Sequence, residues 1–421
     1  MKRRNFLYSM VAGTGLLIPV GHGAWAARAN DAATGAATEA ATKNKLIIIM
    51  LRGAVDGLNV VAPYGDANYA RLRPTIALAR PGQSDGAIDL DGYFGLHPAL
   101  ADMQELWQQK KLAFVHASGS PDFTRSHFDA QDYLESGTPG RKGTADGWMN
   151  RLLANLPGTT TPTRAVSVGA VMPRILSGAV TASNIASGAA GTKANVLDRP
   201  KVGAAFEQMY KENDKYAKAF SDAKEAHQEM MGASMEKEQQ VANGGAPLPN
   251  GFPDDSTRIA TLMRNDPKIQ MVFMALGGWD THANQGAGKG QLANRLSPLG
   301  LGLANLARRL GPMFDDTTIV VMSEFGRTAR QNGNGGTDHG HGNVMWVMGG
   351  KVAGGKVYGD WHGLSNDHLY EGRDVPVTTD FRSVLMQVCE RHMGLSDNQL
   401  LKVFPEQSYA RSNFNLFMNK A

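Results

Sequence analysis

Leu46-Ile47-Ile48-Ile49-Met50-Leu51 is an unbroken apolar run of strand length near the start of the 421-residue chain. A strand with one side in water alternates apolar and polar residues, but no polar residue interrupts this run. The run therefore predicts a parallel strand that is covered on both faces of a sheet. A polar, glycine-containing stretch, Arg52-Gly53-Ala54-Val55-Asp56-Gly57, follows it directly.

Further runs along the chain repeat the alternation of strand and helix. Strands are predicted at residues 112–116, 269–276, 318–322 and 344–348, and helices at residues 98–110, 292–310 and 380–393. Helix-length segments between strands are typical of βαβ units. We therefore predict an α/β fold, with a doubly wound, mainly parallel sheet and helices on both of its faces.

One segment interrupts this alternation. Residues from about 201 to 240 are rich in Lys, Glu, Ala and Met without a strand pattern, and a Gly- and Pro-rich connector follows at 244–253. We interpret residues 201–250 as a helical insertion within a single α/β domain that spans 44–410. The insertion would cover the site or bridge to a partner; the alternative is a solvated helical excursion with no chemical role.

Composition excludes several classes of protein. With 42% hydrophobic and 19% charged residues, the chain has enough apolar material for a large buried core. No short repeat governs the sequence, which excludes collagen-like, coiled-coil and wholly disordered chains. The single cysteine, Cys389, excludes a disulfide scaffold and a cysteine-based zinc site.

The N-terminus has the pattern of an export signal. Lys2-Arg3-Arg4 precedes an apolar stretch, Leu7 to Val20, and a small-x-small sequence, Ala24-Trp25-Ala26. The paired arginines followed by Phe-Leu resemble a twin-arginine (Tat) signal. We predict a Tat signal peptide at 1–26, a flexible leader at 27–43, and a periplasmic or secreted protein that has used the Tat export machinery.

An N-terminal membrane anchor is the alternative. The apolar stretch is short and interrupted by glycines and Pro19, whereas a spanning helix needs about 20 apolar residues, so we expect no stable membrane span in the mature form. Removal of Lys2, Arg3 and Arg4 lowers the formal net charge from +4 to +1. A nucleic-acid partner is therefore not expected.

Acidic residues and histidines collect just after the predicted strands, where an open parallel sheet binds its ligands. Carboxylates are hard oxygen ligands and neutral imidazoles are nitrogen ligands, so this mixture indicates a divalent metal: zinc, manganese, calcium or magnesium. Arg125 or Arg327 would hold the oxygens of an anionic substrate. The candidate metal ligands are Asp56, Asp280, His282, Glu324, Asp338, His339 and His341.

Several of these residues have structural alternatives. Asp56-Gly57 is also a common turn sequence, and Asp280-Thr281-His282 also fits a helix cap with an incidental histidine. Glu324 and Arg327 also fit a surface ion pair. His97, beside Pro98, is interpreted as a helix-entry residue and not as a ligand.

Two common catalytic patterns are missing from the sequence. The glycine-rich stretch from Gly333 to Gly342 lacks the terminal Gly-Lys-Ser/Thr of a phosphate-binding loop. The Gly-x-Ser-x-Gly elbow of serine hydrolases is not found either. The candidate chemistry therefore depends on the metal ligands.

Four motifs together resemble the DUF1501 family of exported bacterial proteins, and the resemblance extends from about residue 45 to 395. They are Arg52-Gly53-Ala54-Val55-Asp56-Gly57-Leu58, Arg125-Ser126-His127-Phe128-Asp129-Ala130-Gln131-Asp132-Tyr133, Gly278-Trp279-Asp280-Thr281-His282 and Ser323-Glu324-Phe325-Gly326-Arg327-Thr328. DUF1501 proteins are in turn distantly similar to the alkaline phosphatase/sulfatase superfamily. That resemblance implies a doubly wound α/β sheet with one or two metals and a nucleophile that attacks a phosphate or sulfate ester.

The superfamily resemblance also implies roles for particular residues. Ser126 or Thr124 would be the nucleophile, although either hydroxyl also fits a helix cap. Phe325 stands where the superfamily usually has a histidine ligand, so that one metal would be lost or held differently. Cys389 lies in a late predicted helix, which excludes a sulfatase-type modified cysteine.

Two functional hypotheses follow from the sequence. The first is an exported metal-dependent hydrolase of small phosphate or sulfate esters, with a metal-activated water as the nucleophile if no side chain attacks. The alternative is a catalytically silent periplasmic or surface protein that keeps the fold and binds a partner.

Overall fold

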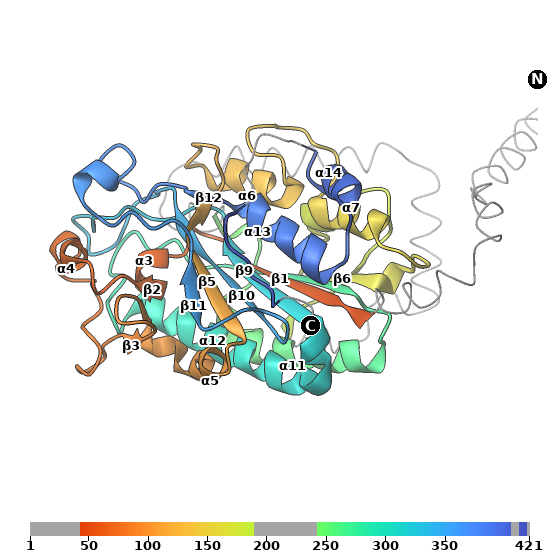
Figure 1. Ribbon diagram of the computed structural model, residues 1–421, viewed down its shortest axis with the longest axis horizontal. Coiled ribbons are helices and arrows are strands. Elements are labelled where there is room, and N and C mark those ends of the chain that lie inside the picture. Colours follow the sequence, from red (N-terminus) through yellow and green to blue (C-terminus); the bar gives the residue numbers. More distant parts are fainter. Residues whose placement is uncertain (1–42, 189–241, 406–411, 419–421) are drawn as a thin grey trace, which may run out of the picture.

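The computed structural model describes residues 43–188, 242–405 and 412–418. The predicted signal peptide at 1–26, the leader up to residue 42 and the part of the predicted insertion before residue 242 lie outside these ranges. The described chain forms a central sheet with helices on both faces (Figure 1).

The central sheet has nine strands in the order β11-β5-β10-β9-β1-β8-β6-β7, with β12 also paired to β5. All of its strand pairs are parallel except the two that β10 forms with β9 and β5. This confirms the predicted mainly parallel sheet. Its strands are β1 (Lys45–Leu51), β5 (Leu112–Gly119), β6 (Ala165–Val168), β7 (Ser183–Ile185), β8 (Met271–Leu276), β9 (Thr317–Ser323), β10 (Asn343–Gly349), β11 (Lys356–Tyr358) and β12 (Thr379–Asp380).

The helices form two layers, one on each face of this sheet. Figure 1 shows α5, α11 and α12 on one face and α6, α7, α13 and α14 on the other. A small second sheet has the order β2 (Val61–Ala62), β4 (Gly95–Leu96), β3 (Ile88–Asp89). The α-helices are α3 (Gly57–Val60), α4 (Ala67–Leu72), α5 (Gln104–Gln108), α6 (His127–Ser136), α7 (Trp148–Asn155), α11 (Phe252–Asn265), α12 (Gln291–Leu310), α13 (Phe381–Gln387) and α14 (Asp397–Val403).

Strand β1 lies between two hydrophobic cores. Ile47, Ile49 and Leu51 pack in the core beneath α11 and α12. Leu46 and Ile48 belong to the opposite core, which α7, α13 and α14 cover. Successive strand residues point to opposite faces, and both faces of β1 are buried in apolar surroundings. This is the physical reason that the strand has no polar alternation.

Some element predictions were wrong in detail. The predicted helix at 98–110 begins as a 3₁₀ helix, Pro98–Met103, before α5. The predicted helix at 380–393 is α13 followed by a π-turn, Val388–His392. The direction of β10 was not predicted, and it runs antiparallel to both of its neighbours. The helix start expected near Ser126 is that of α6. The short strands β2, β3, β4, β6, β7, β11 and β12 and the helices α3, α4, α7, α11 and α14 were not predicted.

The direction of β10 matters for the site. Because β10 is antiparallel to β9, it starts at the sheet edge where β9 ends. The whole connection between Ser323 and Asn343 therefore stays at the carboxyl edge of the parallel strands. The segments that follow β1 and β8 leave the sheet at the same edge. Among the described residues, no helix combines the length and apolar character that a membrane crossing requires.

Candidate metal centre

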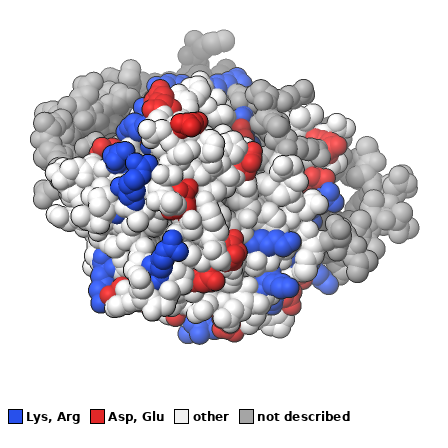
Figure 2. Space-filling view, turned by 60° about the vertical axis from the view of Figure 1, so that its left-hand side comes forward, with Lys and Arg blue, Asp and Glu red and all other residues white. Residues whose placement is uncertain are grey.

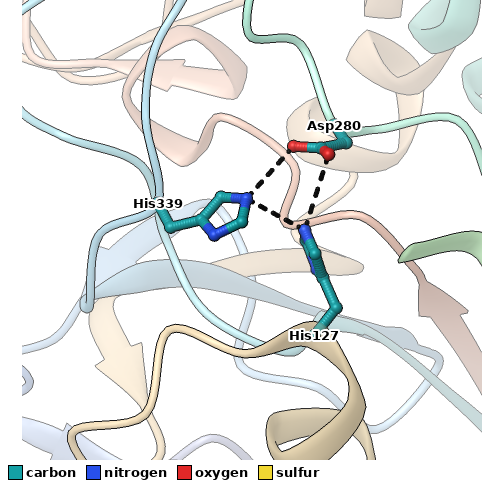
Figure 3. A group of neighbouring side chains, drawn as sticks. All are labelled: His127, Asp280 and His339. Atoms are coloured by element: carbon teal, nitrogen blue, oxygen red, sulfur yellow. Dashed lines mark hydrogen bonds and ion pairs between the residues drawn. The ribbon is translucent and has the colours of Figure 1, made fainter. Parts of the chain in front are cut away.

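Three imidazoles and one carboxylate converge at the carboxyl edge of the sheet. His127 is the first residue of α6, Asp280 and His282 follow β8, and His339 lies in the β9–β10 connection. The Nε2 atom of His339 lies 3.0 Å from Nε2 of His127 and 3.0 Å from Nε2 of His282. Figure 3 shows His127, Asp280 and His339 pointing toward one another from separate segments.

Asp280 completes this cluster. Its Oδ1 atom lies 3.0 Å from Nε2 of His282 and 3.4 Å from Nε2 of His339, and its Oδ2 atom lies 3.6 Å from Nε2 of His127. The carboxylate is 2% exposed, and Oδ2 is buried without a hydrogen-bond partner. A buried carboxylate oxygen without a donor is costly, so an unpartnered Oδ2 beside His127, on a carboxylate whose other oxygen contacts His282 and His339, favours a bound cation.

The other ring nitrogen of each histidine determines the tautomer. His339 Nδ1 lies 2.9 Å from the carbonyl oxygen of Arg125, and this nitrogen must donate because a carbonyl only accepts. His127 Nδ1 lies 2.8 Å from Glu324 Oε1, and His282 Nδ1 lies 3.3 Å from Asp338 Oδ1. Each neutral ring therefore directs an Nε2 lone pair into the cluster. Histidines that bind metals are held in this way through their other nitrogen.

The charges at the cluster match a divalent cation. Asp280, Glu324 and Asp338 carry three negative charges around the imidazoles, and Arg327, which donates to Asp280, carries one positive charge. With neutral histidines the group is therefore left with a charge of −2. A divalent ion bound between the Nε2 atoms would balance it.

The pKa values of the cluster residues reflect the same excess of negative charge. Burial alone would lower the pKa of His127, but the hydrogen bonds and charges of Asp280 and Glu324 raise it to about 9. The hydrogen bond with Asp280 raises the pKa of His282 against the effect of burial. Burial would raise the pKa of Asp280, but the three histidines and Arg327 hold it below its usual range. His127 is thus protonated at pH 7 when no metal is bound.

Glu324 connects the cluster to the core of the sheet. Besides His127, its Oε1 atom accepts from the backbone N–H of Gly53 at 2.7 Å and from Nε2 of Gln131 at 3.0 Å. Gly53 has a φ of +113°, and a Cβ atom there would lie 2.8 Å from the backbone nitrogen of Asp280. Only glycine therefore allows the end of β1 to approach the Asp280 loop this closely.

Phe325 packs directly against two of the imidazoles. Its ring centroid lies 4.8 Å from that of His127 and 5.0 Å from that of His339, and the side chain is 4% exposed. The phenylalanine that departs from the superfamily pattern is therefore an apolar support for two histidines. His127 and His339 supply the imidazoles from other segments.

Of the predicted ligands, the structure brings Asp280, His282 and His339 together in the cluster. Glu324 and Asp338 contact the histidines from outside, each through an Nδ1 atom. Asp56 lies elsewhere: it is buried in an ion pair with Arg73, 2.5 Å from Nη1, and it also accepts from Gln285. Its carboxylate is thereby part of a separate internal network and not a member of the cluster.

His341 also lies outside the cluster. Its Nδ1 atom lies 2.8 Å from Oδ2 of Asp374, and Arg125 and Arg373 donate to the same oxygen. Only Gly340 separates His341 from His339, but the two rings have different partners: His339 contacts His127 and His282, and His341 contacts Asp374. His97 caps the 3₁₀ helix through Nδ1, which accepts from Ala99 N, and this confirms the interpretation as a helix-entry residue.

The residues predicted to bind or attack the substrate differ in how much of each side chain is exposed. Arg327 is 1% exposed and donates to Asp280 and to the carbonyls of Gly53 and Ala54, so it positions the ligand and has no free face for a substrate. The Arg125 side chain is 34% exposed. Ser126 caps α6 by accepting from Asp129 N. These placements correct the expectation that Arg327 holds substrate.

Thr124 has a local role as well. Its Oγ1 atom accepts from the backbone N–H of Ser126 at 3.2 Å. Both candidate hydroxyls thus shape the turn that leads into α6, as the helix-cap alternative described.

His127 was missed as a ligand, although it lies in a motif that resembles the family. Its position in the sequence could have indicated this role. His127 follows an N-cap serine, so it occupies the first turn of a helix that starts at the carboxyl edge of the sheet. Its pairing with Glu324, 197 residues later in the chain, could not be derived from local spacing.

The family described as "Protein of unknown function (DUF1501)" matches residues 106–404 of this chain. The chain belongs to the DUF1501 family. No curated protein matches the chain by sequence.

Several solved structures have a similar fold at low sequence identity. The crystal structure of Ps i-CgsB in complex with k-i-k-neocarrahexaose is 12% identical with a TM-score of 0.38, over 86% of this chain and 75% of that chain. The lipoteichoic acid synthase LtaP from Listeria monocytogenes is 9% identical with a TM-score of 0.39, over the same shares. The PsFucS1 sulfatase from Pseudoalteromonas sp. is 12% identical with a TM-score of 0.36, over 87% and 70%. Such TM-scores support no statement about the chemistry of this chain.

Proposed function

We propose that this protein is an exported metal-dependent hydrolase of small phosphate or sulfate esters. The observation that carries the proposal is the convergence of His127, His282 and His339 Nε2 atoms on the Asp280 carboxylate. These four residues would hold the ion. A bound divalent metal would polarise an ester oxygen and lower the pKa of a water molecule toward neutrality.

The donor set favours some metals over others. Three imidazole nitrogens and one carboxylate fit zinc or manganese, whereas calcium and magnesium prefer oxygen ligands. The unpartnered Oδ2 of Asp280 and the three directed Nε2 atoms are a donor set of this kind. We therefore propose zinc or manganese ahead of calcium and magnesium.

Two arginines support an anionic substrate. The side chains of Arg125 and Arg373 are 34% and 38% exposed, and Arg373 donates to the backbone carbonyl of His339. Both guanidinium groups therefore lie beside the cluster with part of their surface in solvent. A planar guanidinium binds the oxygens of a phosphate or sulfate group through paired hydrogen bonds.

Water is the proposed nucleophile. Ser126 and Thr124 use their side-chain oxygens to order the turn before α6. Neither hydroxyl oxygen contacts a histidine or carboxylate of the cluster that would remove its proton. The cluster residues would instead hold the metal and orient the water and ester on it.

Other expectations are retained here as proposals. These are export through the Tat machinery by residues 1–26, a periplasmic or secreted location, a single domain at 44–410 with an insertion at about 201–250, and no nucleic-acid ligand. On the face in Figure 2, Lys and Arg lie among Asp and Glu in its described part and form no continuous basic stripe there, which supports the last proposal.

Metal content and ester hydrolysis of the same protein preparations test the function. The full chain should retain about one zinc or manganese ion per molecule and hydrolyse one or more phosphate or sulfate esters. His127→Ala should lose both properties. His362→Ala, which removes an exposed histidine paired with Asp360, is the matched control and should keep both.

The outcomes separate the two hypotheses. A folded protein that takes up neither zinc nor manganese would contradict the metal site. Tightly bound metal without hydrolysis across a broad ester panel would favour the alternative, a catalytically silent binding protein.

A further inference from the structure

A cavity of about 950 Å³ lies at the edge of the sheet opposite the metal centre. Lys45 opens β1, and Arg164, Gln270 and Asp316 immediately precede β6, β8 and β9. The cavity therefore runs along the amino ends of four adjacent strands. Its volume lies within the range of small-molecule sites in proteins.

Two cations in its wall are buried without a carboxylate partner. Lys45 is 3% exposed, and its Nζ atom donates to the carbonyl oxygens of Pro267 and Ile269 at 2.7 and 2.6 Å. Arg164 is 4% exposed and donates to Gln270 Oε1 and to two backbone carbonyls. Neither cation forms an ion pair within the described part of the chain. A buried charge without a counter-charge is costly.

Both cations also have N–H groups that are not used in hydrogen bonds to the described residues. An ammonium has three N–H groups and a guanidinium has five. The bonds above leave one N–H of Lys45 and two of Arg164 without an acceptor among the described residues. Burial lowers the pKa of both side chains, because the protein around them stabilises the charge less well than water does, and the charges of Asp266 and Asp316 only partly oppose this for Lys45.

The other charged residues of the lining are mostly cationic, and the lining also contains uncharged polar residues such as Thr159 and Thr161. Lys43 and Lys268 add two positive charges, and the one carboxylate of the lining, Asp316, is already paired with Lys351 at 2.6 Å. Pro312 and Met313 supply apolar surface beside these charges. A ligand that matches this wall has an anionic head and an apolar body.

We propose that this cavity binds a small organic anion, whose head group pairs with Lys45 and Arg164 and whose apolar body packs on Pro312 and Met313. The site is independent of the metal centre, because the two lie at opposite edges of the sheet. Carboxylate, sulfate and phosphate heads share the required chemistry, so the head group is varied in the test.

Equilibrium binding of short-chain amphiphiles to the full chain tests the proposal. Octanoate, octyl sulfate and octyl phosphate should each bind to one site below their micelle-forming concentrations, with the head groups ranked by affinity. Octyltrimethylammonium has the same tail with a positive head and should bind at least tenfold more weakly. Inorganic sulfate alone should compete only weakly, since it lacks the apolar body.

Variants locate the site. Met313→Asp places a negative charge on the cavity wall without touching either buried cation, and should weaken binding of the anions at least tenfold. Lys45→Met removes one buried charge and should do the same; circular dichroism checks that it folds. Lys111→Gln removes a partly exposed cation, paired with Asp315, from a different surface cavity between α5 and α12 and should leave binding unchanged.

The anion site and the hydrolase function can be tested independently of each other. His127→Ala, which should lose the metal, should still bind the anionic amphiphiles with wild-type affinity. Equal binding of the cationic and anionic amphiphiles, unchanged binding by folded Met313→Asp, or no binding by the wild-type chain would each overturn the anion site.

Discussion

His127 Nδ1 lies 2.8 Å from Glu324 Oε1, and this contact joins the start of α6 to the end of β9 beneath the candidate metal centre. In the neutral ring that binds a metal, the carboxylate keeps the proton of His127 on Nδ1, so that the Nε2 lone pair faces Asp280 and His339. The two residues are 197 positions apart in the chain. This pair orients a ligand and supplies one of the negative charges that a divalent ion balances.

Replacement of this carboxylate should weaken metal binding. Glu324→Gln removes the charge, and its amide can also present a donor to His127, which would favour the wrong tautomer. The affinity for zinc should fall by about 10- to 100-fold, as is typical when a partner of a metal-binding histidine is lost. Competition with a chromogenic chelator measures this affinity. Glu371→Gln, which removes an exposed acid near Arg125, should have no effect on it.

Metal binding should release protons. Because Asp280 and Glu324 raise the pKa of His127 to about 9, this ring is protonated at pH 7 in the metal-free protein and must lose its proton to bind an ion. The affinity for zinc should therefore increase as the pH rises from 7 to 9. Calorimetry at pH 7 in buffers of different ionisation enthalpy should show the release. A binding enthalpy that did not depend on the buffer would contradict this account.

The metal-free protein should lose stability in the same pH range. The pKa of His127 is about 6.5 in an unfolded chain and about 9 in the folded one. Its contribution is therefore fully present below pH 6.5 and is lost as the pH rises through 9, on the order of 3 kcal/mol in all. Thermal unfolding from pH 6 to 9.5 should show a falling midpoint for the metal-free wild type. His127→Ala should show a flatter profile.

Gly53 should not tolerate a side chain. Gly53→Ala combines a positive φ, which costs about 1–2 kcal/mol, with a Cβ atom 2.8 Å from the backbone of Asp280. Gly82→Ala is the matched control, because Gly82 also has a positive φ, of +85°, but nothing lies within 4 Å of the added Cβ. Urea unfolding should show a loss about 1–3 kcal/mol larger for Gly53→Ala. That variant should also bind less metal, since Asp280 is displaced.

Arg125 should affect substrate binding without affecting the metal. Arg125→Gln removes a half-exposed guanidinium, while its backbone carbonyl still accepts from His339. The KM for an anionic ester should rise by about 10- to 100-fold, the value of a charge-assisted hydrogen bond, with metal content unchanged. Arg71→Gln, on the exposed side of α4, is the control. A loss of metal from Arg125→Gln would show that the side chain supports the cluster instead.

The two histidines of the Asp338–Gly342 segment should behave differently. His339→Asn removes an Nε2 atom from the centre of the cluster and should abolish tight metal binding. His341→Asn removes a ring that is paired with Asp374 and should leave the metal content unchanged. Metal analysis of both purified variants distinguishes these roles. Equal losses would restore His341 to the ligand set that the sequence indicated.

Much of the fold was predictable because burial leaves local patterns. The continuous apolar runs of β1 and β9 and the apolar face of α12 reflect packing on the whole length of an element, so a few consecutive residues identify each one. The direction of β10 was not predictable. Its residues are buried on both faces whichever way the strand runs, so its composition carries no information on direction.

The sequence by itself determined the long strands β1, β5, β8, β9 and β10 of the sheet, the mixture of carboxylates and histidines at its carboxyl edge, and the Asp280–His282 pair. Only the tertiary structure decided which side chains meet. It brought His127 into the cluster, paired Asp56 with Arg73 and His341 with Asp374, and buried Arg327 behind Asp280. Apolar burial is a property of each residue and its near neighbours. A ligand set depends on distances between residues far apart in the chain, and only packing sets those distances.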